Sequence, residues 1–182
     1  MTGVSTLAKM LNPKIKVIGV EPAAAASMTA ALEAGEPVTL DSANTIADGT
    51  AVKRVGEKIF PYAKENIDSV LTVADDELIA VFLDMVENHK MIVENSGLLT
   101  VAALRQLDLK GKKAVAILSG GNMDVITMSS GLFSNARLLT ASNSAFTSSK
   151  SSPKDSYLCF AASPTIAPQV QSSNCRLRHP AS

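Results

Sequence analysis

The stretch that decides the fold is Lys113-Ala-Val-Ala-Ile-Leu-Ser-Gly-Gly-Asn122. Its five consecutive apolar residues, Ala114 to Leu118, are bounded by charge on one side and by Gly-Gly on the other. This pattern is typical of a buried parallel strand. The two glycines allow the backbone to turn sharply or to approach a ligand closely. Asn122 can then cap a short helix over Met123–Met128.

A strand, a Ser-Gly-Gly-Asn turn and a helix place the hydroxyl of Ser119 and several free amides at the carboxyl edge of a sheet. Open α/β sheets bind their ligands at that edge. The same turn is equally compatible with an ordinary strand-to-helix connection, because glycine is common in such turns. The chain contains no G-x-G-x-x-G and no G-x-x-x-x-G-K-[ST] motif, so this stretch alone leaves the class of site open.

The composition is that of an ordinary globular protein. The chain has 182 residues, a length that is enough for one sizeable core. Of these residues, 46% are hydrophobic and 19% are charged, and the net charge is zero. Zero net charge gives no electrostatic reason to expect a nucleic-acid or membrane partner. No apolar run is long enough to span a bilayer, and the first residues are too polar for a signal peptide. We therefore expect a cytoplasmic location.

The last 49 residues differ from the rest of the chain. Up to Phe133, 12 Lys+Arg against 16 Asp+Glu give a net charge of −4, whereas from Ser134 onward 5 against 1 give +4. This segment holds 12 serines and shows neither helical nor strand periodicity. We predict that residues 133–182 form a Ser-rich, disordered tail. Its Cys159 and Cys175 lack the spacing of a metal site or a redox pair.

The chain up to residue 132 alternates helical and strand patterns. Periodicity predicts helices over 3–11, 27–34, 52–59, 77–87 and 98–106, and strands over 15–20, 69–73 and 113–118. This alternation predicts an α/β fold with a parallel sheet covered by helices on both faces. Because such a domain normally opens on a strand, we expect that a first strand is missing from this chain.

Glu94 is the second candidate site residue. It follows the apolar run Met91–Val93 and precedes a helix, whose free amides stabilise a carboxylate even where it has no further role. In a parallel sheet, Glu94 would reach the same edge as Ser119. We expect His89, at the end of a helix, to be solvated or locally hydrogen-bonded. With no Ser/His/Asp set and no metal-ligand cluster, the patterns name no reaction.

Four phrases carry a resemblance to a known family. They are Lys16-Val-Ile-Gly-Val-Glu-Pro22, Thr45-Ile-Ala-Asp-Gly-Thr-Ala-Val52, Val93-Glu-Asn-Ser-Gly97 and Leu118-Ser-Gly-Gly-Asn122. In this order and at these spacings, residues 1–132 resemble the threonine dehydratases (threonine ammonia-lyases). These are pyridoxal-phosphate enzymes of the tryptophan-synthase-β-like fold (fold type II), which also includes serine racemase. The resemblance implies part of the three-layer catalytic domain over residues 1–132.

The resemblance also implies pyridoxal 5'-phosphate as cofactor and a cofactor-binding role for three residues. Ser119 matches the serine that hydrogen-bonds the pyridine nitrogen, Gly120 lies beside it, and Glu94 matches a glutamate beside the ring. A neutral hydroxyl leaves that nitrogen largely unprotonated, which favours elimination over transamination. The implied reaction converts the amino acid threonine to 2-oxobutanoate and ammonia, and serine to pyruvate.

Some parts of the family pattern have no counterpart. The Schiff-base lysine motif, the Asn-His motif and the glycine-rich phosphate loop are missing, and none of Lys9, Lys14 and Lys16 lies in a matching context. We therefore expect this chain to be the later part of the catalytic domain, to carry no catalytic residue, and to be inactive alone.

The metal prediction depends on position 27. In the racemase branch Glu21, the carbonyl of residue 25 and an acid at position 27 would bind a cation, but Ser27 replaces the acid, so no metal is expected. Two alternatives to an ammonia-lyase stay open: a serine racemase-like enzyme, and a non-catalytic fragment or partner subunit. A lone fragment should form no specific lysine adduct with an aldehyde. We expect a homo-oligomer for the full-length family.

Overall fold

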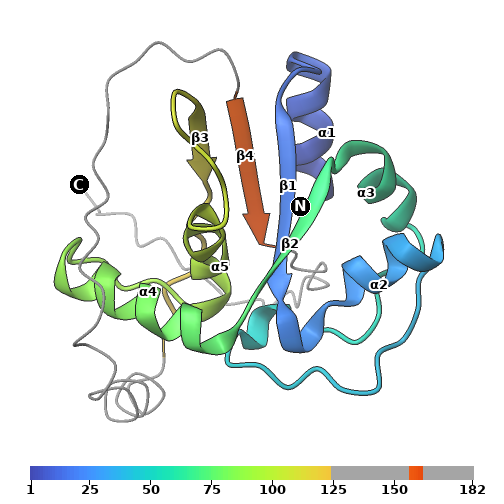
Figure 1. Cartoon of the computed structure of the whole chain (residues 1–182). Helices are drawn as coiled ribbons and strands as arrows, with labels where there is room; N and C mark the ends of the chain where they lie inside the picture. Colours follow the sequence, from blue (N-terminus) through green and yellow to red (C-terminus); the bar gives the residue numbers. More distant parts are fainter. Residues whose placement is uncertain (124–155, 162–182) are drawn as a thin grey trace, which may run out of the picture.

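The computed structural model describes residues 1–123 and 156–161. It contains a four-stranded parallel sheet in the order β2-β1-β4-β3, with helices on both faces (Figure 1). The strands are β1 (Lys16–Pro22), β2 (Ser69–Val73), β3 (Lys113–Ala116) and β4 (Ser156–Ala161). The predicted parallel α/β architecture is confirmed.

Five α-helices and two short 3-10 turns, η1 and η2, connect the described strands. They are α1 (Thr2–Leu11), η1 (Ala23–Ala25), α2 (Ser27–Ala34), η2 (Asp48–Thr50), α3 (Phe60–Asn66), α4 (Asp75–Glu87) and α5 (Asn95–Leu104). The predicted helices at α1, α2, α4 and α5 are confirmed to within a few residues. The helix predicted over 52–59 is wrong, because α3 begins at Phe60 with Pro61 in its first turn. A proline there loses no hydrogen bond, so it starts this helix instead of ending one.

The main core lies between the sheet and the pair α4–α5. Leu78 of α4 and Leu98 of α5 are completely buried in one cluster with Ile18 and Val20 of β1 and Val73 of β2. On the other face, smaller clusters join α1, α2 and α3 to the sheet (Figure 1). β1 is buried at every residue after Lys16, as expected for a parallel strand covered on both sides.

The amino ends of β1 and β2 are joined by Asp68. One carboxylate oxygen accepts hydrogen bonds from Lys9 Nζ and the Val17 amide, both at 2.7 Å, and the other faces Lys16 Nζ at 3.4 Å. Burial alone would raise the pKa of Asp68. The hydrogen bonds from Lys9 and Val17, with the positive charge of Lys9, outweigh burial and leave this pKa below its ordinary value.

β4 departs from the predicted tail. Residues 133–182 were expected to be disordered, but residues 156–161 form a strand paired with both β1 and β3. A run of apolar residues that shows no period can still be fixed by partners on either side, which sequence periodicity does not reveal. The rest of the predicted tail, and nearly all of the predicted helix over 123–128, lie outside the described residues. Within the described residues, no helix is long and apolar enough to cross a membrane.

Candidate functional site at the carboxyl end of the sheet

Glu94, Ser119 and Gly120 lie together just beyond the carboxyl end of β3. The Glu94 amide donates to the carbonyl oxygen of Gly120 at 3.3 Å. The Glu94 carboxylate packs so closely on Gly120 that a Cβ added there would overlap it. Gly120 has φ 77°, a left-handed backbone conformation that favours glycine. The structure thus makes neighbours of the three predicted site residues, whose role in binding a cofactor stays a prediction.

The turn after β3 rests on the first turn of α5. A Cβ on Gly97 would overlap the carbonyl oxygen of Ser119, so the backbones meet directly at this position. One turn further along α5, the Thr100 hydroxyl donates to the carbonyl oxygen of Ile117 at 3.0 Å. These contacts fix the Ser-Gly-Gly turn against the helix whose amino end carries Glu94.

Gly49 and Ser96 belong to the same place, although sequence analysis did not select them. A Cβ on Gly49 would lie 2.8 Å from Ser96 Oγ and 4.0 Å from Glu94 Oε1. Ser96 is only 5% exposed, and its hydroxyl has no hydrogen-bond partner within the described residues. A buried hydroxyl without a partner loses its hydration, which marks a position where a bound group can supply the missing hydrogen bond.

Asp75 and Asn95 hold the loop that carries Gly49. The Asp75 carboxylate accepts hydrogen bonds from the Thr45 hydroxyl at 2.6 Å and the Ile46 amide at 3.1 Å. The Asn95 side chain donates to the carbonyl oxygen of Ile46 at 3.1 Å. Asn95 directly precedes Ser96, so its hydrogen bond to Ile46 holds the loop that carries Gly49 next to Ser96. Both Gly49 and Ser96 lie inside the family phrases, which is the signal that could have found them.

Glu21, at the carboxyl end of β1, has a structural partner. Its buried carboxylate accepts hydrogen bonds from the Met28 amide at 2.9 Å, and from the amide and hydroxyl of Thr29 at 2.8 and 2.6 Å. It therefore caps α2, a helix with no capping side chain of its own. Among the described residues, no group of three or more His, Cys, Asp and Glu side chains is placed to hold a metal ion.

The residues of this edge fit one side of a pyridoxal phosphate ring. The Ser119 hydroxyl is exposed and can hydrogen-bond a ring nitrogen. Gly49 and Gly120 present backbone without side chains, and Ser96 offers a buried hydroxyl in need of a partner. This donor set suits a flat heteroaromatic ring held at its edge.

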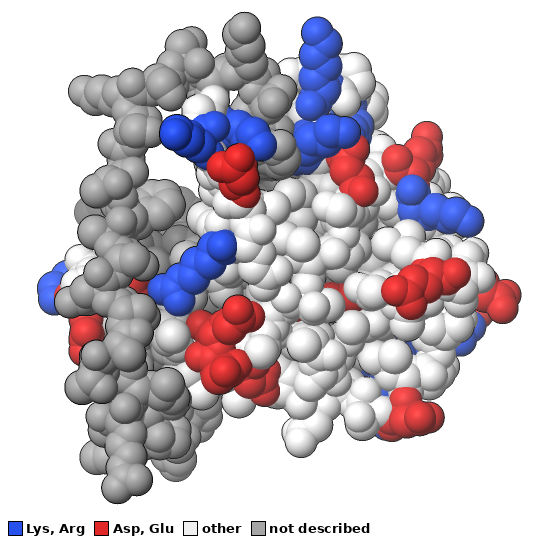
Figure 2. Space-filling model, viewed as in Figure 1, with Lys and Arg blue, Asp and Glu red and all other residues white. Residues whose placement is uncertain are grey.

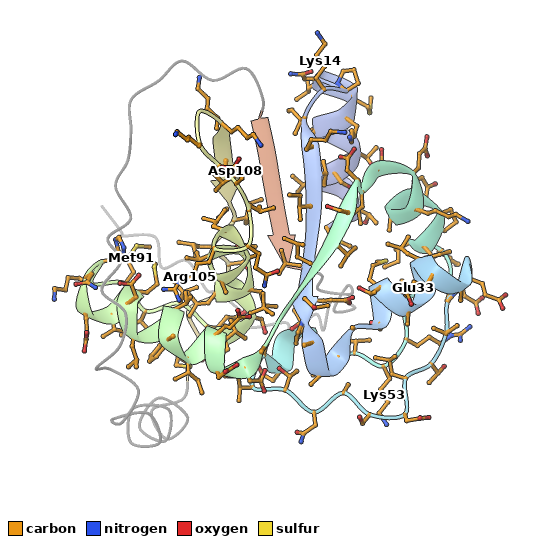
Figure 3. All side chains as sticks on the ribbon, viewed as in Figure 1. Lys14, Glu33, Lys53, Met91, Arg105 and Asp108 are labelled. Carbon is orange, nitrogen blue, oxygen red and sulfur yellow. The ribbon has the colours of Figure 1, made fainter. Side chains whose placement is uncertain are left out.

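The lysines near the amino terminus lie far from the candidate site. Lys9 and Lys16 pair with Asp68 at the amino ends of the strands. Lys14 projects beyond the same end of β1 in Figure 3, away from the site. All three lie at the opposite end of the sheet from Ser119. That none of them replaces the Schiff-base lysine stays a prediction.

A parallel sheet with helices on both faces, and a glycine-rich turn at its carboxyl edge, define an α/β protein of the class that binds ligands at this edge. The sequence profile of the pyridoxal-phosphate dependent enzyme family matches residues 1–120, so the chain belongs to that family. The chain is 41% identical over 130 residues to the biosynthetic L-threonine dehydratase of Pasteurella multocida, and 40% identical over 126 residues to the L-threonine ammonia-lyase of Thermotoga maritima.

Solved structures agree with this family. The processed form of threonine deaminase isoform 2 from Solanum lycopersicum matches with a TM-score of 0.66 and 38% identity, over 71% of this chain and 39% of that one. Serine racemase from Dictyostelium discoideum matches with a TM-score of 0.58 and 38% identity, over 68% and 40%. The predicted fold, family and cofactor class are confirmed.

The matches cover only part of the related proteins. The two curated relatives are matched over 69% of this chain but over only 25% and 31% of their own lengths. The chain therefore spans a quarter to a third of the curated relatives it matches.

Proposed function

We propose that this chain forms the pyridine-nitrogen side of a pyridoxal-phosphate-dependent threonine ammonia-lyase that also accepts serine. The observation that carries the proposal is the grouping of Glu94, Ser119 and Gly120 at one edge of a parallel sheet. The names of the curated relatives, L-threonine dehydratase and L-threonine ammonia-lyase, support the same reaction.

Each residue of the site has a role in this proposal. The cofactor, when bound, supplies the electron sink for loss of the α-proton. The Ser119 hydroxyl binds its ring nitrogen without adding a charge. The Glu94 carboxylate and the Ser96 hydroxyl, which both lie next to Gly49, orient the bound group at the edge of the site. Asp75 and Asn95 keep the Gly49 loop in place around it.

The covalent amine and the phosphate-binding amides come from outside the described residues in this proposal. Covalent catalysis needs a lysine amine, and the phosphate needs a nest of backbone amides. We therefore expect the 182 residues alone to form no specific pyridoxyl-lysine after borohydride reduction. A homo-oligomer and a cytoplasmic location also stay predictions.

A serine racemase-like enzyme is the second candidate, since a serine racemase matches at the same 38% identity as the deaminase. Two observations favour the lyase. Both carboxylate oxygens of Glu21 are engaged by α2, and position 27, where the racemase cation would need an acid, is Ser27. Both candidates act on a small hydroxy amino acid.

A chimera tests the proposal. Residues 1–130 replace the matching part of the Thermotoga maritima L-threonine ammonia-lyase, and release of 2-oxobutanoate from threonine is measured. We expect an active chimera, and a Ser119→Ala version slowed about a hundredfold. Ser42→Ala, an exposed serine outside the site, serves as the control and should leave the rate unchanged.

Three outcomes are distinguishable in this experiment. Release of 2-oxobutanoate that depends on Ser119 supports the ammonia-lyase. Formation of D-serine from L-serine without ammonia would favour the racemase. A folded chimera that loads the cofactor but does neither would support a non-catalytic fragment, and would overturn the proposal.

A further inference from the structure

β4 fills a place in the sheet that the family-matched residues leave open. Residues 1–120 supply β1, β2 and β3, yet β1 and β3 do not pair with each other. β4 lies between them and pairs in parallel with both (Figure 1). Neighbouring strands lie about 4.8 Å apart, so the gap between β1 and β3 is one strand wide. The matched part of the chain therefore contains a slot for one parallel strand.

The strand in this slot matters most for β3. Among the described strands, β3 pairs only with β4, through Lys113 to Ala116. β1 differs because it also pairs with β2, through Ile18 to Pro22. Ser119 and Gly120 follow three and four residues after β3 ends. The strand in the slot is thus the link through the sheet between the candidate site and β1.

We infer that the slot between β1 and β3 is a strand-acceptor site, filled in this chain by Ser156–Ala161, and that this inserted strand positions Ser119 and Gly120. The segment comes from beyond the family match, where no role is assigned to it by the family. It binds by main-chain pairing on both sides, as a strand added to a sheet does. The inference does not depend on which cofactor or substrate the site takes.

The sequence of the segment suits this place. Ser156-Tyr-Leu-Cys-Phe-Ala161 contains no charge, no proline and no glycine, whereas Lys154-Asp155 precede it and Pro164 follows it. Uncharged, aromatic and apolar residues are typical of a strand with neighbours on both sides. Its distance along the chain is no obstacle, because the entropic cost of closing a loop grows only with the logarithm of its length.

A disulfide test examines the register directly. Ala116 is the register partner of Cys159, at a spacing that a disulfide can bridge. In the full chain with Cys175→Ser, we expect Ala116→Cys to form a disulfide with Cys159 under mild oxidation, identified in non-reduced peptides by mass spectrometry. The matched control is Lys113→Cys, which lies three residues, about 10 Å, further along the strand and should not react. Equal reaction at both positions, or none at either, would overturn the inference.

Hydrogen exchange tests the positioning role. Leu158→Pro removes a main-chain donor from β4, which an inserted strand between two neighbours does not tolerate. We expect amide exchange in the peptide covering β3 to rise about tenfold or more, while β2 keeps its protection. Ser148→Pro, outside β4, is the control and should change amide exchange in neither β3 nor β2. Unchanged exchange in β3 would contradict the inference, and if Leu158→Pro unfolds the whole chain, the disulfide result decides.

Discussion

The two ends of the sheet use carboxylates in opposite ways. At the amino end, Asp68 accepts hydrogen bonds from two lysines and one backbone amide, so its charge is fully compensated. At the carboxyl end, Glu94 lies against Gly120 and accepts no hydrogen bond through its carboxylate within the described residues, next to the unpaired hydroxyl of Ser96. Buried or half-buried polar groups are normally paired, so the exceptions indicate where a ligand belongs.

The charged side chains at the amino end are of both signs. Figure 2 shows several basic side chains toward the top of the view, where the strands begin in Figure 1, with acidic side chains beside them. The amino end is thus an ion-paired, structural end. The carboxyl end keeps polar groups that have no hydrogen-bond partner among the described residues. The amino end of the sheet therefore contributes to stability, whereas the carboxyl end offers groups that a ligand can bind.

The largest expected effect comes from the core that joins the two ends. Leu98, completely buried on α5, supports the helix that carries Glu94 and Ser96. Leu98→Ala should lower the free energy of unfolding by about 2–5 kcal/mol, because it leaves a cavity in a packed core. Urea denaturation measures the change. Leu118→Ala, at a residue 36% exposed, is the control and should cost clearly less. Equal costs would mean that α5 is not the common support of the site.

A smaller effect is expected at the site itself. Gly120→Ala combines a left-handed backbone with a Cβ that overlaps the Glu94 carboxylate, so we expect a loss of about 1–3 kcal/mol and a displaced Glu94. Gly121→Ala is the neighbouring control, because its Cβ would meet nothing nearer than the Ile92 carbonyl oxygen at 3.8 Å. Thermal unfolding measures the loss of stability, and chemical shifts of the Glu94 region report the displacement of Glu94. A tolerated Gly120→Ala with unshifted Glu94 signals would show that the two residues are not packed together.

The parts of this comparison that depend on local pattern could be predicted from the sequence. The stripe of α4 and the apolar run of β1 follow from periodicity, and Ser119 and Glu94 follow from short phrases next to them. The start of α3 was missed because proline both ends and begins helices, so Pro61 alone does not decide between them.

The parts that were missed depend on long-range contacts. β4 lies in a Ser-rich segment without strand periodicity, and only its pairing with β1 and β3 defines it as a strand. Gly49 meets Ser96 because Asp75 and Asn95 hold the loop before it, and no local pattern encodes contacts between residues so far apart in sequence. Proximity of this kind is a product of the packed fold.

The smallest expected effect tests the amino end, through its pH dependence. The pKa of Asp68 is lowered in the folded protein, so its stabilising contribution is present above the ordinary aspartate pKa of about 4 and is lost as the pH falls through the lower folded value. Asp68→Asn should therefore lower the free energy of unfolding by about 1–2 kcal/mol at pH 7, and by progressively less below about pH 4. Denaturation curves between pH 3 and pH 8 measure this difference. Asp108→Asn, an exposed control, should stay within about 0.5 kcal/mol of the unmodified chain throughout. If the deficit of Asp68→Asn did not depend on pH, the ionised carboxylate would not be what joins α1, β1 and β2, and the contrast with Glu94 would lose its physical basis.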